Sequence, residues 1–271
     1  MGMYWNPVNF IVPLVTVLTA LIGTYEYCKC AQARKHEPIL PVAWLLALGL
    51  ILGGVFFRKY GSAFGMNTML AVLGGAFVVC GSAIVARDRP ERSIADMAVT
   101  LFAGLYTGLP LGLLMALHSV CGASPDKRLE GNFLLMFVIA LTWIADSGAY
   151  FVGKAYGRTR LCPRLSPNKT VEGLLGGFAA TIVFAILLRL APLPGRDVLL
   201  WSDIPWLALF FCVVTPLGDL TESVIKRDAG VKDSGRDFTG HGGILDVIDS
   251  LLFTAPSTYL YFFATRPDLF Q

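Results

Sequence analysis

The chain has 271 residues, of which 55% are hydrophobic and 15% are charged, and its formal net charge is +3. So few charged residues cannot cover the surface of a soluble protein of this size, whereas a protein surrounded by hydrocarbon does not need them. The small net charge also argues against nucleic acid as a partner. The composition therefore predicts an integral membrane protein.

Successive apolar stretches of about 20 residues, the length that crosses a bilayer, run along the whole chain. We predict eight spans, at residues 8–27, 39–57, 68–86, 94–117, 132–155, 173–190, 205–223 and 243–264. Each should be a helix, because a backbone within hydrocarbon must satisfy its own hydrogen bonds. The predicted fold is an all-α polytopic membrane protein with about eight transmembrane helices. No connection is long enough to separate two domains, so residues 1–271 should form one domain, with N-terminal helices over 1–131 and catalytic helices over 132–264.

Lys and Arg are concentrated in alternate connections between the predicted spans. The first, third, fifth and seventh connections hold 3, 3, 5 and 4 of them, which is 15 of the 22 in the chain. Connections rich in Lys and Arg remain in the cytoplasm during membrane insertion. We therefore expect a multi-pass protein of the inner (cytoplasmic) membrane, with these four connections in the cytoplasm and both termini outside.

Acidic residues gather in the C-terminal spans, where ionisable groups are costly and usually mark function. They are Asp146 in the fifth predicted span, Asp219 and Glu222 near the end of the seventh, and Asp246 and Asp249 at the start of the eighth. The last two pairs are each spaced by three residues, so each pair shares one helix face. Carboxylates without a nearby His or Cys suit a hard ion, above all Mg²⁺. Hydrogen bonding between helices and a proton relay are the alternatives that spacing alone leaves open.

Two other features are predicted to be structural. Glu26 and Asp96 lie close to the ends of predicted spans, so we expect them to be solvated boundary residues. Gly104, Gly108 and Gly112 recur at every fourth position, the spacing that lets membrane helices approach closely.

Basic residues flank the acidic ones. Lys226, Arg227, Lys232 and Arg236 occupy the connection between the two acidic helix faces. Acids that hold a metal, flanked by bases that bind phosphates, are typical of phosphoryl and nucleotidyl transfer. The alternative is that these bases only satisfy the positive-inside rule, which leaves the acids unexplained.

The fifth connection carries a second candidate phosphate site. Ser166 followed by Pro167 predicts a helix N-terminus with Lys169 in its first turn, where free N–H groups would face an anion. Glu172 is either part of this cradle or a favourable first-turn charge. His241 is a further candidate donor to phosphate, since the two glycines after it allow close backbone approach.

Residues 223–249, which read SVIKRDAGVKDSGRDFTGHGGILDVID, closely resemble the signature of the phosphatidate cytidylyltransferase family. That signature has the form S-x-x-K-R, a short spacer, K-D-x-G and then G-H-G-G-x-x-D-R-x-D. Residues 146–153 (DSGAYFVG) and 163–173 (PRLSPNKTVEG) resemble two upstream stretches of the same family. The resemblance covers about residues 143–255.

The resemblance implies that the protein transfers a cytidylyl group from CTP to phosphatidate in the bilayer, giving CDP-diacylglycerol and pyrophosphate with Mg²⁺. It implies a polar, cytoplasm-facing cavity formed by the C-terminal helices, and it leaves open a second, monovalent cation and a homodimer. Metal binding is implied for Asp219, Asp246 and Asp249, which with Lys226 and Lys232 form the implied catalytic set. Substrate contacts are implied for Ser166, Lys169, Arg227, Asp233, His241 and Asp146.

One position departs from the family signature. Val247 stands where the family usually has Arg, a strong bidentate donor to phosphate. Arg236 or Arg227 is a candidate substitute. Three other functions remain open from sequence: a related enzyme acting on another lipid, an ion-coupled transporter that uses the same acids, and a catalytically silent scaffold.

Overall fold

The protein consists almost entirely of long helices. A computed structural model describes residues 8–87, 91–120, 125–163, 165–231 and 242–270. Within these residues, seven helices are long and apolar enough to cross a membrane. They are α1 (Val8–Ala33), α2 (Leu40–Tyr60), α3 (Ser62–Ala86), α4 (Ser93–Val120), α5 (Pro125–Tyr156), α6 (Val171–Leu190) and α7 (Asp203–Ala229). Large apolar side chains such as Leu45, Val78 and Phe151 are exposed on their outer faces. A multi-pass membrane protein explains such a surface.

The eighth predicted span is a broken helix. Its residues form α8 (Ile244–Ile248) and α9 (Leu251–Thr265), with Asp249 and Ser250 at the break. At 1.5 Å per residue α9 is about 22 Å long, shorter than the ~30 Å hydrocarbon core. The break packs tightly against α7, where a Cβ atom on Gly218 would lie 2.5 Å from the Asp249 carbonyl oxygen. The Ser250 hydroxyl also donates to the Thr215 carbonyl of α7 at 3.2 Å.

A two-stranded antiparallel hairpin joins α5 to α6. Strands β1 (Arg160–Cys162) and β2 (Ser166–Thr170) pair with Arg160 opposite Thr170. The predicted helix N-terminus at Ser166 is therefore wrong, because Ser166 and Lys169 lie in β2 and α6 begins at Val171. The N-cap of α6 is Thr170, whose hydroxyl accepts the Gly173 N–H at 3.1 Å.

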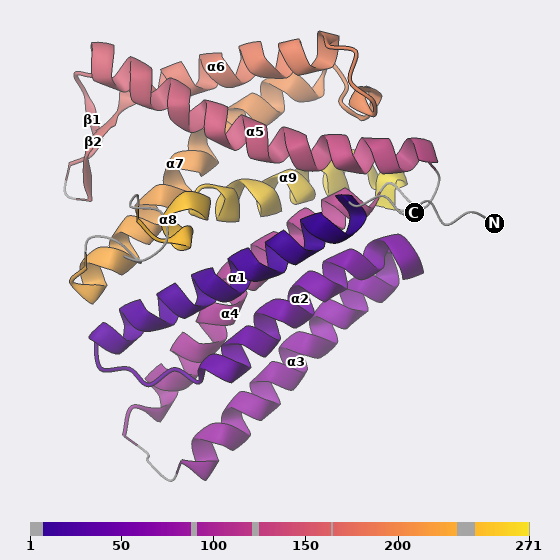
Figure 1. The fold of residues 1–271 in the computed structure, drawn as a ribbon. Coiled ribbons are helices and arrows are strands. Elements are labelled where there is room, and N and C mark those ends of the chain that lie inside the picture. The colour runs from indigo at the N-terminus through magenta and orange to yellow at the C-terminus, as the bar shows by residue number, and fades with distance from the viewer. Residues whose placement is uncertain (1–7, 88–90, 121–124, 164, 232–241, 271) are drawn as a thin grey trace.

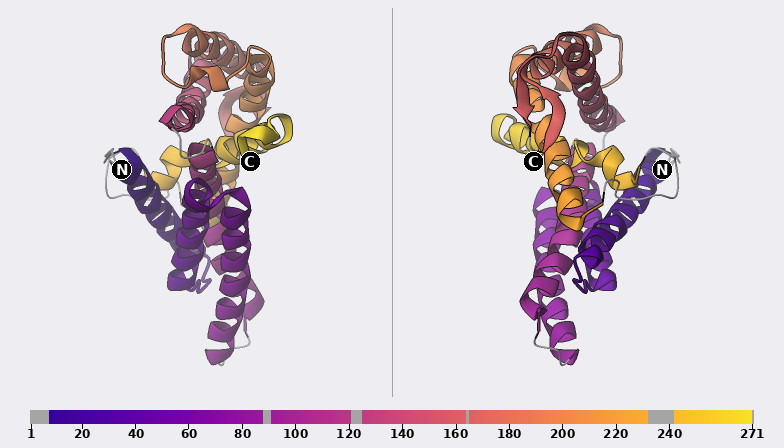
Figure 2. Two further views of the ribbon diagram at one scale, coloured as in Figure 1. Left: turned by 90° about the vertical axis from the view of Figure 1, so that its right-hand side faces the viewer. Right: turned by 90° about the vertical axis from the view of Figure 1, so that its left-hand side faces the viewer.

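The helices form two packed groups with the C-terminal helices between them. Figure 1 shows α5 and α6 together at the top, α1–α4 together below, and α7, α8 and α9 in the space between; Figure 2 shows the same groups from both sides. Short 3₁₀ turns follow α6 (Arg196–Val198) and α9 (Pro267–Phe270). A continuous cluster of buried apolar side chains runs through both groups, from Ala20 of α1 to Phe270.

Glycines allow the closest helix contacts, as their spacing predicted. A Cβ atom on Gly104 of α4 would lie 2.6 Å from the Ala43 carbonyl oxygen of α2, and one on Gly112 would lie 2.6 Å from that of Leu50. Such distances leave no room for a side chain, so the close packing of α4 on α2 requires glycine at these positions.

Three of the Lys- and Arg-rich connections meet at one end of the molecule. Arg92 and Arg87, beside the α3–α4 connection, donate to the Lys35 and Glu37 carbonyl oxygens of the α1–α2 connection at 2.9 and 2.7 Å. Arg34, just after α1, forms an ion pair at 3.0 Å with Asp228 at the end of α7. These contacts place the first, third and seventh connections side by side.

Candidate active site

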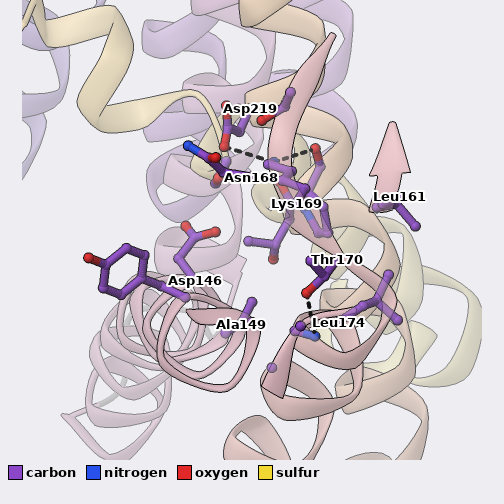
Figure 3. Close-up of a pocket in the computed structure, with 18 of the residues that line it drawn as sticks. Asp146, Ala149, Leu161, Asn168, Lys169, Thr170, Leu174 and Asp219 are labelled. Carbon is purple, nitrogen blue, oxygen red and sulfur yellow. Dashed lines mark hydrogen bonds and ion pairs between the residues drawn. The ribbon is translucent and has the colours of Figure 1, made fainter. Parts of the chain in front are cut away.

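The main cavity of the described residues lies beside the α5–α6 hairpin and has a volume of about 800 Å³. It is walled by the C-terminal part of α5, the hairpin, the first turns of α6, the middle of α7 and the break between α8 and α9. Figure 3 shows Asp146, Lys169 and Asp219 pointing toward this space from three of those elements. Two of the glycine-mediated contacts between α5 and α6, at Gly173 and Gly177, form part of its wall.

Four predicted acidic residues line the cavity. Asp146 comes from α5, Asp219 from α7, and Asp246 and Asp249 from α8 and the break that follows it. Asp246 and Asp249 are one helical turn apart and both face the cavity, as their spacing predicted. The Asp249 side chain is buried, with only 9% of the residue exposed. The cavity therefore has a strongly acidic wall.

The carboxylates suit a hard cation, but the described side chains do not present three ligands to one point. No group of three His, Cys, Asp or Glu side chains close enough to hold a metal ion occurs in the part of the chain that the structure describes. Mg²⁺ is commonly held by only one or two carboxylates, with water and substrate phosphates completing its shell. The donor chemistry therefore fits Mg²⁺ bound together with a nucleotide.

Lys169 joins the hairpin to the acidic wall. Its ammonium group lies 2.7 Å from an Asp219 carboxylate oxygen and donates to the Pro216 carbonyl oxygen at 3.0 Å (Figure 3). The Asp219 carboxylate also accepts from the Ser223 hydroxyl at 3.3 Å. Lys169 thus reaches the cavity from a strand rather than from a helix N-terminus.

Lys226 occupies a different place from the one predicted. Its ammonium group forms ion pairs with Glu222, at 2.9 Å, and with Asp246. Glu222 is 1% exposed, and neither Lys226 nor Glu222 lines the cavity. Lys226 therefore supports Asp246 from behind the cavity wall.

The other predicted site residues divide into three groups. Ser166 lines the cavity from β2. Arg227 is exposed at the end of α7 and does not line the cavity. Lys232, Asp233 and His241 lie outside the described residues.

Three basic residues line the cavity although the sequence analysis counted them only among the Lys and Arg residues of the fifth connection. They are Lys154, Arg158 and Arg160, at the end of α5 and the start of the hairpin. The Glu172 carboxylate accepts the Arg158 and Thr159 backbone N–H groups at 3.0 and 3.1 Å, so its role is to hold the turn that presents these bases. With Lys169, they give the cavity a basic side formed by the end of α5 and the hairpin, and Lys169 brings this side into contact with the acidic wall.

Glu26 and Asp96 are not the solvated residues that the sequence predicted. Both are only 8% exposed. Glu26 accepts the Ile244 and Leu245 backbone N–H groups of α8, and Asp96 accepts the Glu37 N–H at 2.9 Å. The prediction failed because α1 extends to Ala33. Glu26 therefore lies inside the helical bundle rather than at a span end.

Val247, the residue that stands where the family signature usually has Arg, lies away from the cavity. Its side chain is 51% exposed on α8 and is not part of the cavity wall among the described residues.

Comparison with known proteins identifies the family. Residues 2–265 match the Cytidylyltransferase family, so the match extends through the N-terminal helices as well as the signature region. The chain is 47% identical over 252 residues to the phosphatidate cytidylyltransferase of Bacillus subtilis, covering 91% of this chain and 87% of that one. It is 34% identical to those of Thermotoga maritima, covering 93% and 87% of the two chains, and Brucella suis, covering 92% and 83%. The chain belongs to the Cytidylyltransferase family.

Proposed function

We propose that this protein is a phosphatidate cytidylyltransferase, which converts phosphatidate and CTP to CDP-diacylglycerol and pyrophosphate for phospholipid synthesis. The observation that carries the proposal is a cavity with an acidic wall and a basic side, to which the family signature contributes Asp246 and Asp249 and the two upstream stretches contribute Asp146, Ser166 and Lys169. Relatives that cover most of the chain at 34–47% identity carry this name. The apolar outer surface of the helices suits a lipid acceptor.

In the proposed reaction, a phosphate oxygen of phosphatidate attacks the α-phosphorus of CTP. A new P–O bond forms, the bond between the α-phosphorus and its bridging oxygen breaks, and pyrophosphate leaves with that electron pair. The attacking phosphate is already ionised at neutral pH, so no side chain needs to remove a proton. Lys169, Arg158 and Arg160 bind phosphates on the basic side of the cavity, and the fixed positive charges stabilise the charge that builds up in transfer.

Mg²⁺ is the proposed cofactor, with Asp219, Asp246 and Asp249 as the candidate ligands and Asp146 beside them. When bound, the ion would neutralise charge on the phosphates of CTP. All three line the cavity, and two of them pair with lysines there: Asp219 with Lys169 and Asp246 with Lys226. A second, monovalent cation is compatible with the same acidic wall.

The cytoplasmic side is the proposed location of the site. Three basic connections lie together at one end of the molecule, and the fifth, the hairpin, lines the cavity. A cytoplasmic opening brings the cavity to water-soluble CTP, while phosphatidate stays in the inner membrane. A homodimer is compatible with this arrangement.

The test is transfer of label from CTP to phosphatidate by the purified protein in detergent, with Mg²⁺ and with excess chelator. We expect labelled CDP-diacylglycerol from the parent with Mg²⁺ and none with chelator. Asp219→Asn should lower the rate at least ~100-fold, because it removes a charge that faces the phosphates. Asp197→Asn is the matched control, since Asp197 also forms an ion pair with a basic side chain, that of Arg189, but lies outside the cavity.

Other results of the same assay would contradict specific parts of the proposal. Transfer to another lipid phosphate but not to phosphatidate would overturn the acceptor. Full activity in chelator would overturn the metal requirement. Equal activity of the Asp219→Asn and Asp197→Asn variants would overturn the role of Asp219.

A further inference from the structure

The short helix α8 carries much of the acidic wall but has little stability of its own. It contains five residues, Ile244–Ile248, and a helix of this length does not persist in isolation. Asp246 lies within it and Asp249 follows it directly. The placement of both carboxylates therefore depends on what holds α8 against its neighbours.

Glu26 of α1 holds the first turn of α8 at two points. Its Oε1 atom accepts the Ile244 N–H at 3.1 Å and its Oε2 atom accepts the Leu245 N–H at 2.7 Å. Charge-assisted hydrogen bonds to both oxygens of one carboxylate restrict rotation as well as translation. The negative charge also lies at the favourable end of the α8 backbone dipoles.

The remaining contacts of α8 agree with this anchoring role. The Gly243 N–H is taken by Asp246 of α8 itself at 2.6 Å, so Asp246 and Glu26 together satisfy three successive backbone donors. Behind them α1 packs directly on α8, because a Cβ atom on Gly23 would lie 3.6 Å from Leu245 and 3.7 Å from Ile248 side-chain atoms.

We propose that Glu26 is a positioning residue for catalysis, which fixes α8 so that Asp246 meets Lys226 and Asp249 faces the cavity. The effect on activity rests on the proposed function. The hydrogen bonds between Glu26 and α8 do not depend on it. Both of its hydrogen bonds to α8 are accepted from backbone N–H groups, so Glu26 acts on the backbone of α8. The N-terminal helices thereby contribute to a site whose other walls come from residues after 144.

The test compares Glu26→Gln with Asp96→Asn. Gln keeps the size of the side chain, but its NH₂ group cannot accept the second backbone N–H. Asp96 is equally buried and also accepts a backbone N–H, from Glu37, but it does not contact α8. Each variant is measured for kcat and KM in CTP transfer, and for hydrogen–deuterium exchange of peptides that contain residues 242–250.

We expect Glu26→Gln to lower kcat about 10- to 100-fold, because misplacing a reacting group by about 1 Å can cost that much. Hydrogen–deuterium exchange should become faster in peptides from α8 but not in peptides from α2 and α3. Asp96→Asn should change neither readout. Faster exchange without loss of kcat would overturn the positioning role. Loss of kcat without faster exchange would overturn the route through α8, and equal losses in both variants would reduce Glu26 to a general stabiliser.

Glu26→Asp keeps the inference testable if Glu26→Gln does not yield folded protein. Its charge is retained but its reach is one methylene shorter, so a smaller loss of kcat with the same local exchange pattern is expected. Unchanged exchange at α8 in this variant would overturn the proposal. Failure of the proposed function has a different signature, because the parent itself would then make no CDP-diacylglycerol while the exchange result would still report the anchoring of α8.

Discussion

The ion pair between Lys169 and Asp219 offers a direct test of how the hairpin contributes to the site. Lys169→Met keeps the length of the side chain but removes the ammonium group that lies 2.7 Å from Asp219 and 3.0 Å from the Pro216 carbonyl oxygen. Hydrogen bonds to charged groups contribute about 1.5–3 kcal/mol, and the 39% exposure of the Asp219 side chain lowers this toward about 1–2 kcal/mol. Since 1 kcal/mol corresponds to roughly 2–4 °C in a protein of this size, the melting temperature should fall by about 2–8 °C.

The same variant should lose activity beyond its loss of stability. Lys169 contacts the acidic wall directly at Asp219, and removing a preorganised charge of this kind typically costs about 10²–10³ in kcat. Lys154→Met is the matched control, because Lys154 also lines the cavity but is exposed and contacts Tyr150, with its ammonium group 3.5 Å from the hydroxyl and 5.6 Å from the ring centre. Its melting temperature should stay within about 1 °C of the parent.

Thermal unfolding in detergent and labelled-CTP transfer measure the two effects. The double variant with Asp219→Asn completes a cycle, in which the stability losses should be non-additive by about 1 kcal/mol if the two side chains interact in solution. Equal effects of the Lys169 and Lys154 substitutions, or strictly additive losses in the cycle, would refute the reasoning.

Two further substitutions test packing and the departure from the signature. Gly104→Leu should lower the free energy of unfolding by about 1–3 kcal/mol or more, because the new side chain clashes with α2. Gly75→Ala on α3 should raise it by about 0.5–1 kcal/mol, because a Cβ atom there would meet nothing within 4 Å. Thermal unfolding measures both changes, and two changes of the same sign would contradict the packing. Val247→Arg should leave the free energy of unfolding within about 0.5 kcal/mol of the parent and the transfer rate within about threefold, because residue 247 is half exposed and outside the cavity. A tenfold gain in rate would show instead that a side chain at position 247 reaches the substrate.

The positions of the membrane helices were predictable because hydropathy is a local property of the sequence. Seven of the eight predicted spans match α1 to α7, with differences at their ends. The break at Asp249 and Ser250 was not predicted, because neither residue is a Gly or Pro that would mark it; in the structure it packs against Gly218 of α7. The acids of the cavity could be found because charges are rare within apolar segments.

Long-range partners explain the two clearest errors. The Ser166–Pro167 pair is a reasonable local signal for a helix start, but Lys169 pairs with a residue 50 positions later and the segment is extended as a strand. Glu26 accepts hydrogen bonds from residues 218 and 219 positions later. No spacing rule connects residues so far apart in the sequence. From the sequence alone, Glu26 was therefore predicted to be a solvated residue at the end of a span.

The acidic wall raises a physical question, because carboxylates crowded in a half-buried cavity repel one another. The structure answers it with lysine: Lys169 lies against Asp219, and Lys226 lies between Glu222 and Asp246. Each ammonium group offsets part of that repulsion, and each occupies carboxylate oxygens that a divalent cation would also favour. Of the two, only Lys169 lines the cavity among the described residues. In the proposed function, the phosphates of bound CTP would offer its ammonium group a new partner, and an Asp219 oxygen would then become available to a cation. Lys226 would meanwhile keep its place between Glu222 and Asp246 and hold the wall from behind.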